Sequence, residues 1–190
     1  MFPLNVPNLL TLARILLVPV VVVALLVESP QGPTVAAVVF AFAALTDGLD
    51  GYIARARRSV TTFGKVMDPI ADKLMIAAAL LSLVSLDRVQ AWVAMVIIAR
   101  EFAVSGLRIA AGQQGVVIPA SPLGKVKTIA QVGAVMALIA VDDAGVLWLQ
   151  ALVYATVAVT LLSGADYFLN FRRRIEEART SLGPEVMSAD

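Results

Sequence analysis

The sequence predicts an all-α, polytopic membrane protein with six transmembrane helices, and two observations lead to this fold class. Of the 190 residues, 59% are hydrophobic and 15% are charged, with a mean hydropathy of +0.87, whereas a typical soluble domain carries about 25% charged residues. The apolar residues gather in six segments, each close to the roughly 20 helical residues that cross a bilayer core. These segments are 7–27, 34–57, 66–86, 91–111, 124–141 and 145–171.

The stretches between the segments contain residues that end helices. The first segment opens with the polar-spotted NVPNLLTLAR before an apolar run from Ile15 to Val27, and this run is too short to span a bilayer alone, so we expect its start in the membrane interface. No repeat or flexible linker divides the chain, which predicts one domain over residues 1–171 and a basic, then polar, tail over 172–190. The remaining breaks are ESPQGP, LDRVQ, GQQGVVIPASPLG and DDAG.

The distribution of cations predicts the orientation of the helices. If the N-terminus is cytoplasmic, Arg88 is the only one of the 15 Lys and Arg residues in the outward loops. Cytoplasmic loops carry the excess of Lys and Arg in membrane proteins, so both termini are expected in the cytoplasm, with membrane lipids around the helices. The net charge of +1 gives no reason to expect a nucleic-acid partner.

Four aspartates mark the cytoplasmic ends of the second and third segments. Asp47 and Asp50 close the second segment, and Asp68 and Asp72 open the third. Spacings of three and four residues place each pair on one helix face, so two antiparallel helices could direct all four carboxylates at one volume. Grouped carboxylates near lipid are costly unless a cation lies between them. Because the chain lacks His and Cys, oxygen ligands favour two Mg²⁺ or Mn²⁺ ions.

Glycines and cations accompany these aspartates. Gly51 and Gly64 remove side chains where a phosphorylated ligand could approach the backbone, and Arg55 is near enough in sequence to contact phosphate oxygens. The pattern indicates a pyrophosphate site. The alternative is a solvated helix end whose aspartates form salt bridges with neighbouring Arg and Lys residues; four aspartates on matched faces favour the metal site.

Eight positions within a 26-residue window resemble the signature of the CDP-alcohol phosphotransferase family. They are Asp47, Asp50, Gly51, Ala54, Arg55, Gly64, Asp68 and Asp72. The resemblance implies a six-helix membrane enzyme, usually a homodimer, that transfers a phosphatidyl or similar group from a CDP-linked donor to an alcohol and releases CMP. It further implies that the aspartates bind two divalent metals on the donor pyrophosphate and that Asp72 is the catalytic base.

A second cationic cluster predicts a phosphate on the accepting alcohol. Arg100 lies well inside the fourth segment, where an arginine usually faces a partner or a cavity, and Arg108 follows two turns later. Lys125 and Lys127, beside Thr128, open the fifth segment. Such a cluster suits a second phosphate, although the two lysines could instead anchor the helix in anionic lipid.

From about residue 4 to 170 the chain also resembles the bacterial phosphatidylglycerophosphate synthase subfamily, through NVPNLLTLARILLVP, FGKVMDPIADKL, AREF, GKVKTIAQ and SGADYF. The resemblance implies transfer of a phosphatidyl group from CDP-diacylglycerol to glycerol 3-phosphate at the cytoplasmic face of the bacterial inner (plasma) membrane. It also places Asn8, Thr11 and Arg14 near the donor. Asp166 is interpreted as a satisfied charge at the end of the sixth segment.

Other functions remain open on the sequence alone. A CDP-dependent cardiolipin synthase or a phosphatidylinositol phosphate synthase would share the aspartate signature and also take a phosphate-bearing alcohol. A divalent-cation transporter could use four aspartates as a transit site, but its carboxylates should lie near the membrane midplane, between related halves of the chain. A catalytically silent scaffold has no need of the eight signature residues.

Overall fold

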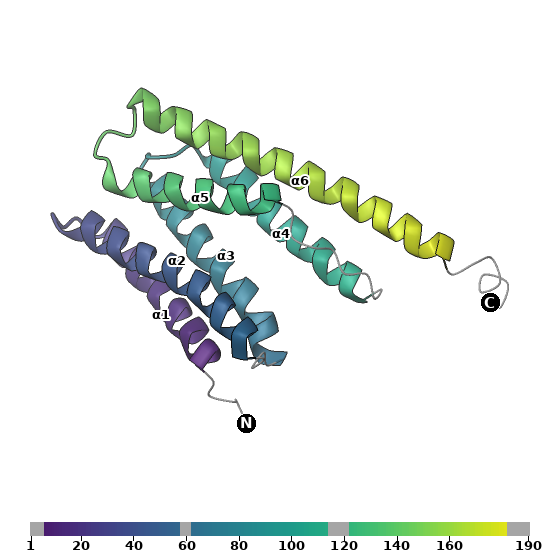
Figure 1. Ribbon diagram of the computed structural model, residues 1–190. Coiled ribbons are helices and arrows are strands. Elements are labelled where there is room, and N and C mark those ends of the chain that lie inside the picture. Colours follow the sequence, from purple (N-terminus) through teal and green to yellow (C-terminus); the bar gives the residue numbers. More distant parts are fainter. Residues whose placement is uncertain (1–5, 58–61, 114–121, 182–190) are drawn as a thin grey trace.

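The computed structural model describes residues 6–57, 62–113 and 122–181, and the side chains of 9–46, 67, 70, 71, 73–113 and 122–176. Within these ranges the chain forms six α-helices and no strand (Figure 1). The all-α prediction with six helices is confirmed. The helices are α1 (Val6–Leu26), α2 (Gly32–Arg57), α3 (Thr62–Ser85), α4 (Ala91–Gln113), α5 (Pro122–Ala140) and α6 (Leu147–Ser181).

The largest departure from the expected segment boundaries is at the end of α6. The helix continues to Ser181 instead of ending at residue 171, because the segment after Phe171 is rich in Arg, Glu and Ala, which favour helix. Arg172 and Glu176, one turn apart, also form an ion pair at 3.6 Å. The basic cluster that opens the predicted tail therefore lies on a helix.

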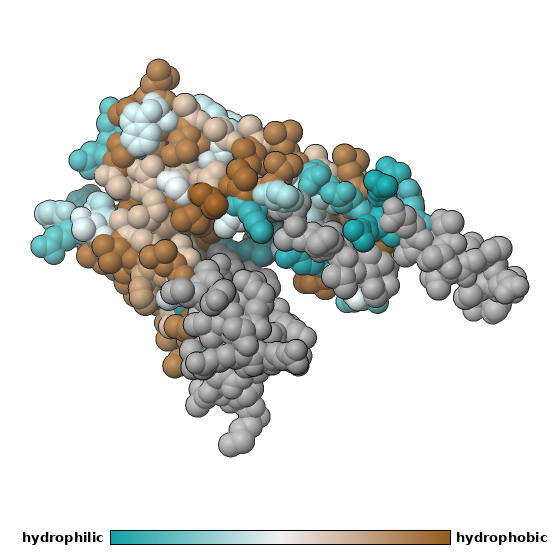
Figure 2. Space-filling view, viewed as in Figure 1, coloured by the Kyte–Doolittle hydropathy of each residue, from teal (hydrophilic) through white to brown (hydrophobic). Residues whose placement is uncertain are grey.

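Three of the described helices are long and apolar enough to cross a membrane, over Leu9–Leu26, Pro122–Ala140 and Leu147–Glu176. The apolar stretches of α2 and α3 are shorter, and α4 carries three charged residues. Large hydrophobic side chains are exposed on all six helices, and Figure 2 shows a hydrophobic band between two hydrophilic ends. Lipid contact accounts for this exposed apolar surface, so the chain has the character of a membrane protein.

The helices pack as two groups, α1 to α3 and α4 to α6, and contacts of α3 and α5 join the groups. α1 packs against α2 and α3, whereas α6 packs against α4 and α5; α5 also contacts α2 and α3, and α3 contacts α4. Large buried side chains from all six helices form one core, and they include Val21, Phe40, Leu80, Leu83, Val93, Leu138 and Leu149. A smaller cluster of Val104, Ala111 and Tyr167 joins α4 to α6 beyond this core.

The loop between α3 and α4 holds the bundle together at the C-terminal ends of α3 and α5. Asp87 has a φ of 56° and its amide donates to Val84, while the Arg88 amide donates to Leu83; this hydrogen-bond pattern ends the helix through one left-handed residue. The Arg88 guanidinium donates to the carbonyls of Leu138 and Asp142, at 2.8 and 2.9 Å. A cation at a helix C-terminus is favourable, so this loop clamps α5.

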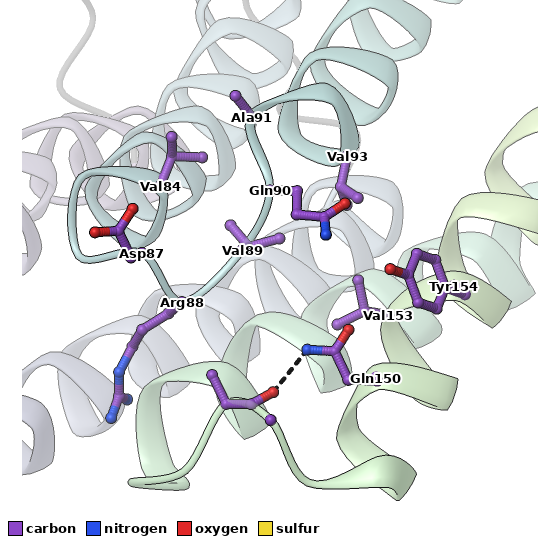
Figure 3. Close-up of a pocket in the computed structure, with 12 residues that line it drawn as sticks. Val84, Asp87, Arg88, Val89, Gln90, Ala91, Val93, Gln150, Val153 and Tyr154 are labelled. Carbon is purple, nitrogen blue, oxygen red and sulfur yellow. Dashed lines mark hydrogen bonds between the residues drawn. The ribbon is translucent and has the colours of Figure 1, made fainter.

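A cavity of about 390 Å³ adjoins the clamp and is lined by the α3–α4 loop, the α5–α6 loop and the start of α6. Figure 3 shows Gln150 donating across it to the carbonyl of Ala144, at 2.7 Å. Near this cavity the rings of Trp92 and Tyr154 stack with centroids 6.1 Å apart. The cavity lies at the opposite end of α3 from Asp68 and Asp72.

Candidate functional site

A central cavity of about 300 Å³ lies where five helices, α1 to α5, meet. Its walls combine hydrophobic side chains of α2 and α3 with charged and polar side chains from α1, α3, α4 and α5. The polar residues that line it are Arg14, Lys73, Glu101, Ser105, Arg108, Lys127, Thr128 and Gln131. Among the described residues, the cavity therefore gathers four cations and one carboxylate within a mostly apolar bundle.

The aspartate positions continue the helix faces that line this cavity. On α2, Ala43 and Ala44 line the cavity, and position 47 follows one turn later. On α3, Ile76 lines the cavity and position 72 precedes it by one turn. The side chains of the eight signature residues lie outside the described part of the structure, although their positions are helical. Among the described side chains no group of three potential metal ligands is present.

A lateral cavity of about 410 Å³ lies between α4, α5 and α6. Arg100, Lys125 and Tyr167 line the lateral cavity but not the central one, whereas Arg108 and Thr128 line both cavities. The expected cationic cluster is thus divided: Lys127 faces the central cavity, and Arg100 and Lys125 face the lateral one. The two volumes meet at a shared wall that carries a guanidinium and a hydroxyl.

Glu101 links the cations of neighbouring helices. Its carboxylate accepts hydrogen bonds from Lys127 of α5 and, at 3.2 Å, from Arg100 on its own helix. Arg100 also donates to Ser163 of α6 at 2.8 Å. Lys127 is only 5% exposed, and a buried charge of this kind requires a partner. One carboxylate therefore connects α4 to α5, and through Arg100 to α6.

Two residues of α1 predicted to lie near the donor are buried. Arg14 is 3% exposed and lines the central cavity, whereas Thr11 is buried but is not part of the cavity wall. Thr11, Arg14 and Lys73 each make polar interactions within the protein. The side chain of Asn8 lies outside the described residues. Of the two described residues Thr11 and Arg14, the cavity wall contains Arg14.

Sequence reasoning missed two buried polar residues. Tyr167 is 4% exposed, lines the lateral cavity, and has a hydroxyl with no hydrogen-bond partner among the described residues; its ring lies 5.8 Å below the Arg108 guanidinium. Gln131 lines the central cavity, and its Nε2 likewise has no partner in the described part of the chain. Gln131 lies one turn after Lys127, so helical spacing from that lysine was the available signal.

Asp166 does not belong to either cavity wall. Its carboxylate accepts a hydrogen bond from Asn170, one turn later on α6, at 3.1 Å. The carboxylate is thus satisfied at the end of the apolar part of α6, as expected, with an amide as the partner.

The buried donors of Gln131 and Tyr167, which have no partner among the described residues, and the cations that line the two cavities suit an anionic ligand, because buried polar groups normally have partners. Guanidinium, ammonium and hydroxyl groups all donate to phosphate oxygens, and arginine does so with two nitrogens at once. The two adjoining cavities can therefore hold phosphate groups of two molecules, or two phosphate groups of one.

Known proteins resemble this chain over most of its length. The family model described as CDP-alcohol phosphatidyltransferase matches residues 4–162. A CDP-diacylglycerol--glycerol-3-phosphate 3-phosphatidyltransferase of Bacillus subtilis is 41% identical over 86% of this chain and 93% of the relative. A Rickettsia felis protein of the same name is 39% identical, with the same coverage. A probable phosphatidylglycerophosphate synthase of Mycobacterium tuberculosis is 39% identical over 90% of this chain and 83% of the relative.

We expect Glu101→Gln to lower the free energy of unfolding by about 3 kcal/mol, because it leaves the buried Lys127 without its counter-charge. The double variant Glu101→Gln/Lys127→Met should recover most of this loss, since both charges are then gone. Thermal unfolding in detergent, followed by tryptophan fluorescence, measures both effects. Equal stability of Glu101→Gln and the unmodified protein would contradict the proposed importance of this ion pair.

Proposed function

The chain belongs to the CDP-alcohol phosphatidyltransferase family, and on that premise we propose that it transfers the phosphatidyl group of CDP-diacylglycerol to glycerol 3-phosphate. The products are phosphatidylglycerophosphate and CMP. Relatives that carry this activity in their names match most of the chain at about 40% identity. The chain is an enzyme of phospholipid synthesis in a membrane.

The observation that carries this proposal is the pair of adjoining cationic cavities at the aspartate end of α2 and α3. A donor with a pyrophosphate and an acceptor with its own phosphate bring several negative charges into one site. Cations on two sides of a shared wall match that distribution. A cation transporter would need no such cluster of Arg and Lys beside its carboxylates.

Divalent metals fit the aspartate positions. Asp47 continues the cavity-lining face of α2 and Asp72 that of α3 by helical spacing, and carboxylate oxygens are the donors that Mg²⁺ and Mn²⁺ prefer. We propose that Asp47, Asp50, Asp68 and Asp72 hold two such ions. When bound, the ions would neutralise the donor pyrophosphate and stabilise the departing CMP.

The donor side of the site is assigned to α1, α2 and α3. Gly51 and Gly64 leave room for the nucleotide phosphates to approach the helix backbone, and Ala54 and Arg55 complete the family signature beside them. Arg14 extends this surface into the central cavity. Asn8 is proposed to contact the donor through the first turn of α1, whereas Thr11 is buried outside the cavity wall.

The acceptor phosphate is assigned to the lateral cavity and its shared wall. Arg100, Arg108 and Lys125 supply charge there, and Tyr167 lines the same cavity, with a hydroxyl that has no partner among the described residues. Thr128 and Lys127 continue the site towards the central cavity. Binding the phosphate here would direct the glycerol hydroxyl towards the donor, and such positioning supplies much of the catalysis in phosphoryl transfer.

The chemical step needs one proton acceptor and no covalent intermediate on the protein. We assign Asp72 as the base, with a carboxylate oxygen that takes the proton of the attacking glycerol hydroxyl. The hydroxyl oxygen forms a bond to the β-phosphorus as the bond to the CMP oxygen breaks. The neighbouring Lys73 lines the central cavity and adds positive charge where the phosphates meet.

The remaining features of the protein follow the same assignment. Six spans with both termini in the cytoplasm would place the aspartates, Lys125 and Lys127 on the cytoplasmic side and Arg88 outside, in accord with the usual excess of positive charge inside. We propose that the protein lies in the bacterial inner membrane as a homodimer, with its site open to the cytoplasm.

CMP release by the purified protein tests the function directly. With CDP-diacylglycerol and Mg²⁺, we expect release when glycerol 3-phosphate is offered and none with inositol phosphate or serine. Release with phosphatidylglycerol in place of glycerol 3-phosphate would identify a cardiolipin synthase and overturn the acceptor assignment. No release with any alcohol would reject the proposed function.

Asp72→Asn should lower kcat for CMP release by at least about 100-fold, because an amide can neither accept the proton nor bind a metal well. The variant should remain inserted and folded. Asp142→Asn, in the exposed α5–α6 loop, is the matched control and should keep its activity.

EDTA should abolish wild-type turnover and excess Mg²⁺ or Mn²⁺ should restore it; turnover in the chelator would refute the metal site.

Tyr167→Phe should raise KM for glycerol 3-phosphate about 3- to 10-fold, the worth of one hydrogen bond, and leave KM for CDP-diacylglycerol within twofold. Tyr154→Phe makes the same change at the opposite end of the bundle and should alter neither constant. Steady-state kinetics with each substrate varied in turn measures both KM values. An equal change in both KM values would remove Tyr167 from the acceptor site.

A further inference from the structure

Arg100 is held against α6 by Ser163, a residue outside the walls of the central and lateral cavities. Its Nη2 donates to the Ser163 hydroxyl at 2.8 Å, and Nη1 donates to Glu101 at 3.2 Å. Ser163 is fully buried and belongs to neither cavity wall. In Figure 1 the green part of α6 lies beside α4, and these helices are in contact. The hydrogen bond to Ser163 therefore fixes the orientation of the guanidinium from the α6 side.

Gly164 supplies the space that this arrangement needs. A Cβ at this position would lie 3.3 Å from Cγ and 3.9 Å from Nε of Arg100. The first distance is tighter than ordinary contact, so an added methyl group would push the aliphatic part of Arg100 away from α6. Glycine thus allows the arginine to lie flat on the helix, one residue after the serine that binds its end.

Two of the three guanidinium nitrogens are occupied in this way, and the third has no partner. The buried Nε of Arg100 makes no hydrogen bond among the described residues, while Arg100 lines the lateral cavity. Because Glu101 also binds Lys127, any shift of Arg100 disturbs the carboxylate that holds the lysine of the central cavity. The position of Arg100 therefore also affects Lys127, a second cation assigned to the acceptor.

We infer that Ser163 and Gly164 of α6 are positioning residues that set the affinity for the phosphate-bearing acceptor by fixing Arg100. The inference rests on the proposed function, because it concerns the acceptor half of that site. Neither residue contacts substrate. Their effect is expected on acceptor binding and not on the donor, whose signature residues lie on α2 and α3.

Steady-state kinetics of Ser163→Ala and Gly164→Ala test the inference. Each variant should raise KM for glycerol 3-phosphate about 3- to 10-fold, the range for losing or straining one hydrogen bond, with kcat and KM for CDP-diacylglycerol within twofold. Ser163→Thr keeps the hydroxyl and should stay nearer the unmodified protein than Ser163→Val, which has the same shape without it. Thr160→Ala, a buried hydroxyl one turn earlier on α6, is the matched control and should leave all constants unchanged.

A double-mutant cycle separates positioning from a general loosening of the fold. In an Arg100→Ala background, Ser163→Ala should have no further effect on KM for glycerol 3-phosphate, because the residue through which it acts is gone. Additive effects, or equal changes for both substrates, would overturn the inference. If Ser163→Ala does not fold, Gly164→Ala carries the same cycle.

The outcomes distinguish the two proposals. A wild-type protein that does not use glycerol 3-phosphate contradicts the proposed function. A wild-type protein that uses it, with unchanged KM in Ser163→Ala and Gly164→Ala, contradicts only the role of α6.

Discussion

Glu101 is the constraint on which the described arrangement of the site depends. A carboxylate and two cations cannot lie inside an apolar bundle unless they satisfy one another. Glu101 accepts from Arg100 and from Lys127, which sets the distance between α4 and α5 at the level of the cavities. Since Arg100 also binds Ser163, α6 is included in the same network. Three helices are therefore placed by one small group of charges, while hydrophobic packing alone would allow them to slide.

The network acts together with a clamp at the other end of α5. There the Arg88 guanidinium binds the last carbonyls of the helix, and midway Thr156 of α6 donates to Ala130 at 3.3 Å. Polar groups in the bilayer core have no water to bind and must find partners within the protein. Rotation of α5 would break these hydrogen bonds, so each contact also opposes that rotation. A helix fixed at both ends presents Lys127, Thr128 and Gln131 at constant positions.

Much of the fold was predictable because membrane helices are apolar for most of their length. Six segments were located within a few residues of the observed bounds, except at the end of α6, where the pattern of hydrophobicity stops at Phe171 but the preference for helix continues. The division of the cationic residues into two cavities was not predictable. Lys125 and Lys127 are only two residues apart, and which cavity each faces depends on the rotation of α5 set by Glu101. Tyr167 was missed for a similar reason, since a tyrosine near a membrane surface usually indicates an interfacial anchor.

The shared wall between the cavities gives a physical reason for two compartments rather than one. In glycerol 3-phosphate the carbon backbone separates the phosphate from the hydroxyl that attacks, so a site that bound the phosphate beside the metals would place the nucleophile away from the donor. A phosphate held in the lateral cavity, near Arg100 and Lys125, leaves the glycerol free to pass Arg108 and Thr128 into the central cavity. Under the proposed assignment, the separation would also keep the acceptor phosphate from competing with the donor pyrophosphate for the metals, because each anion would have its own cations. Ordering two anionic substrates in this way would cost little additional binding energy, since Arg100, Arg108 and Lys127 already have contacts with Glu101, Ser163 or the ring of Tyr167.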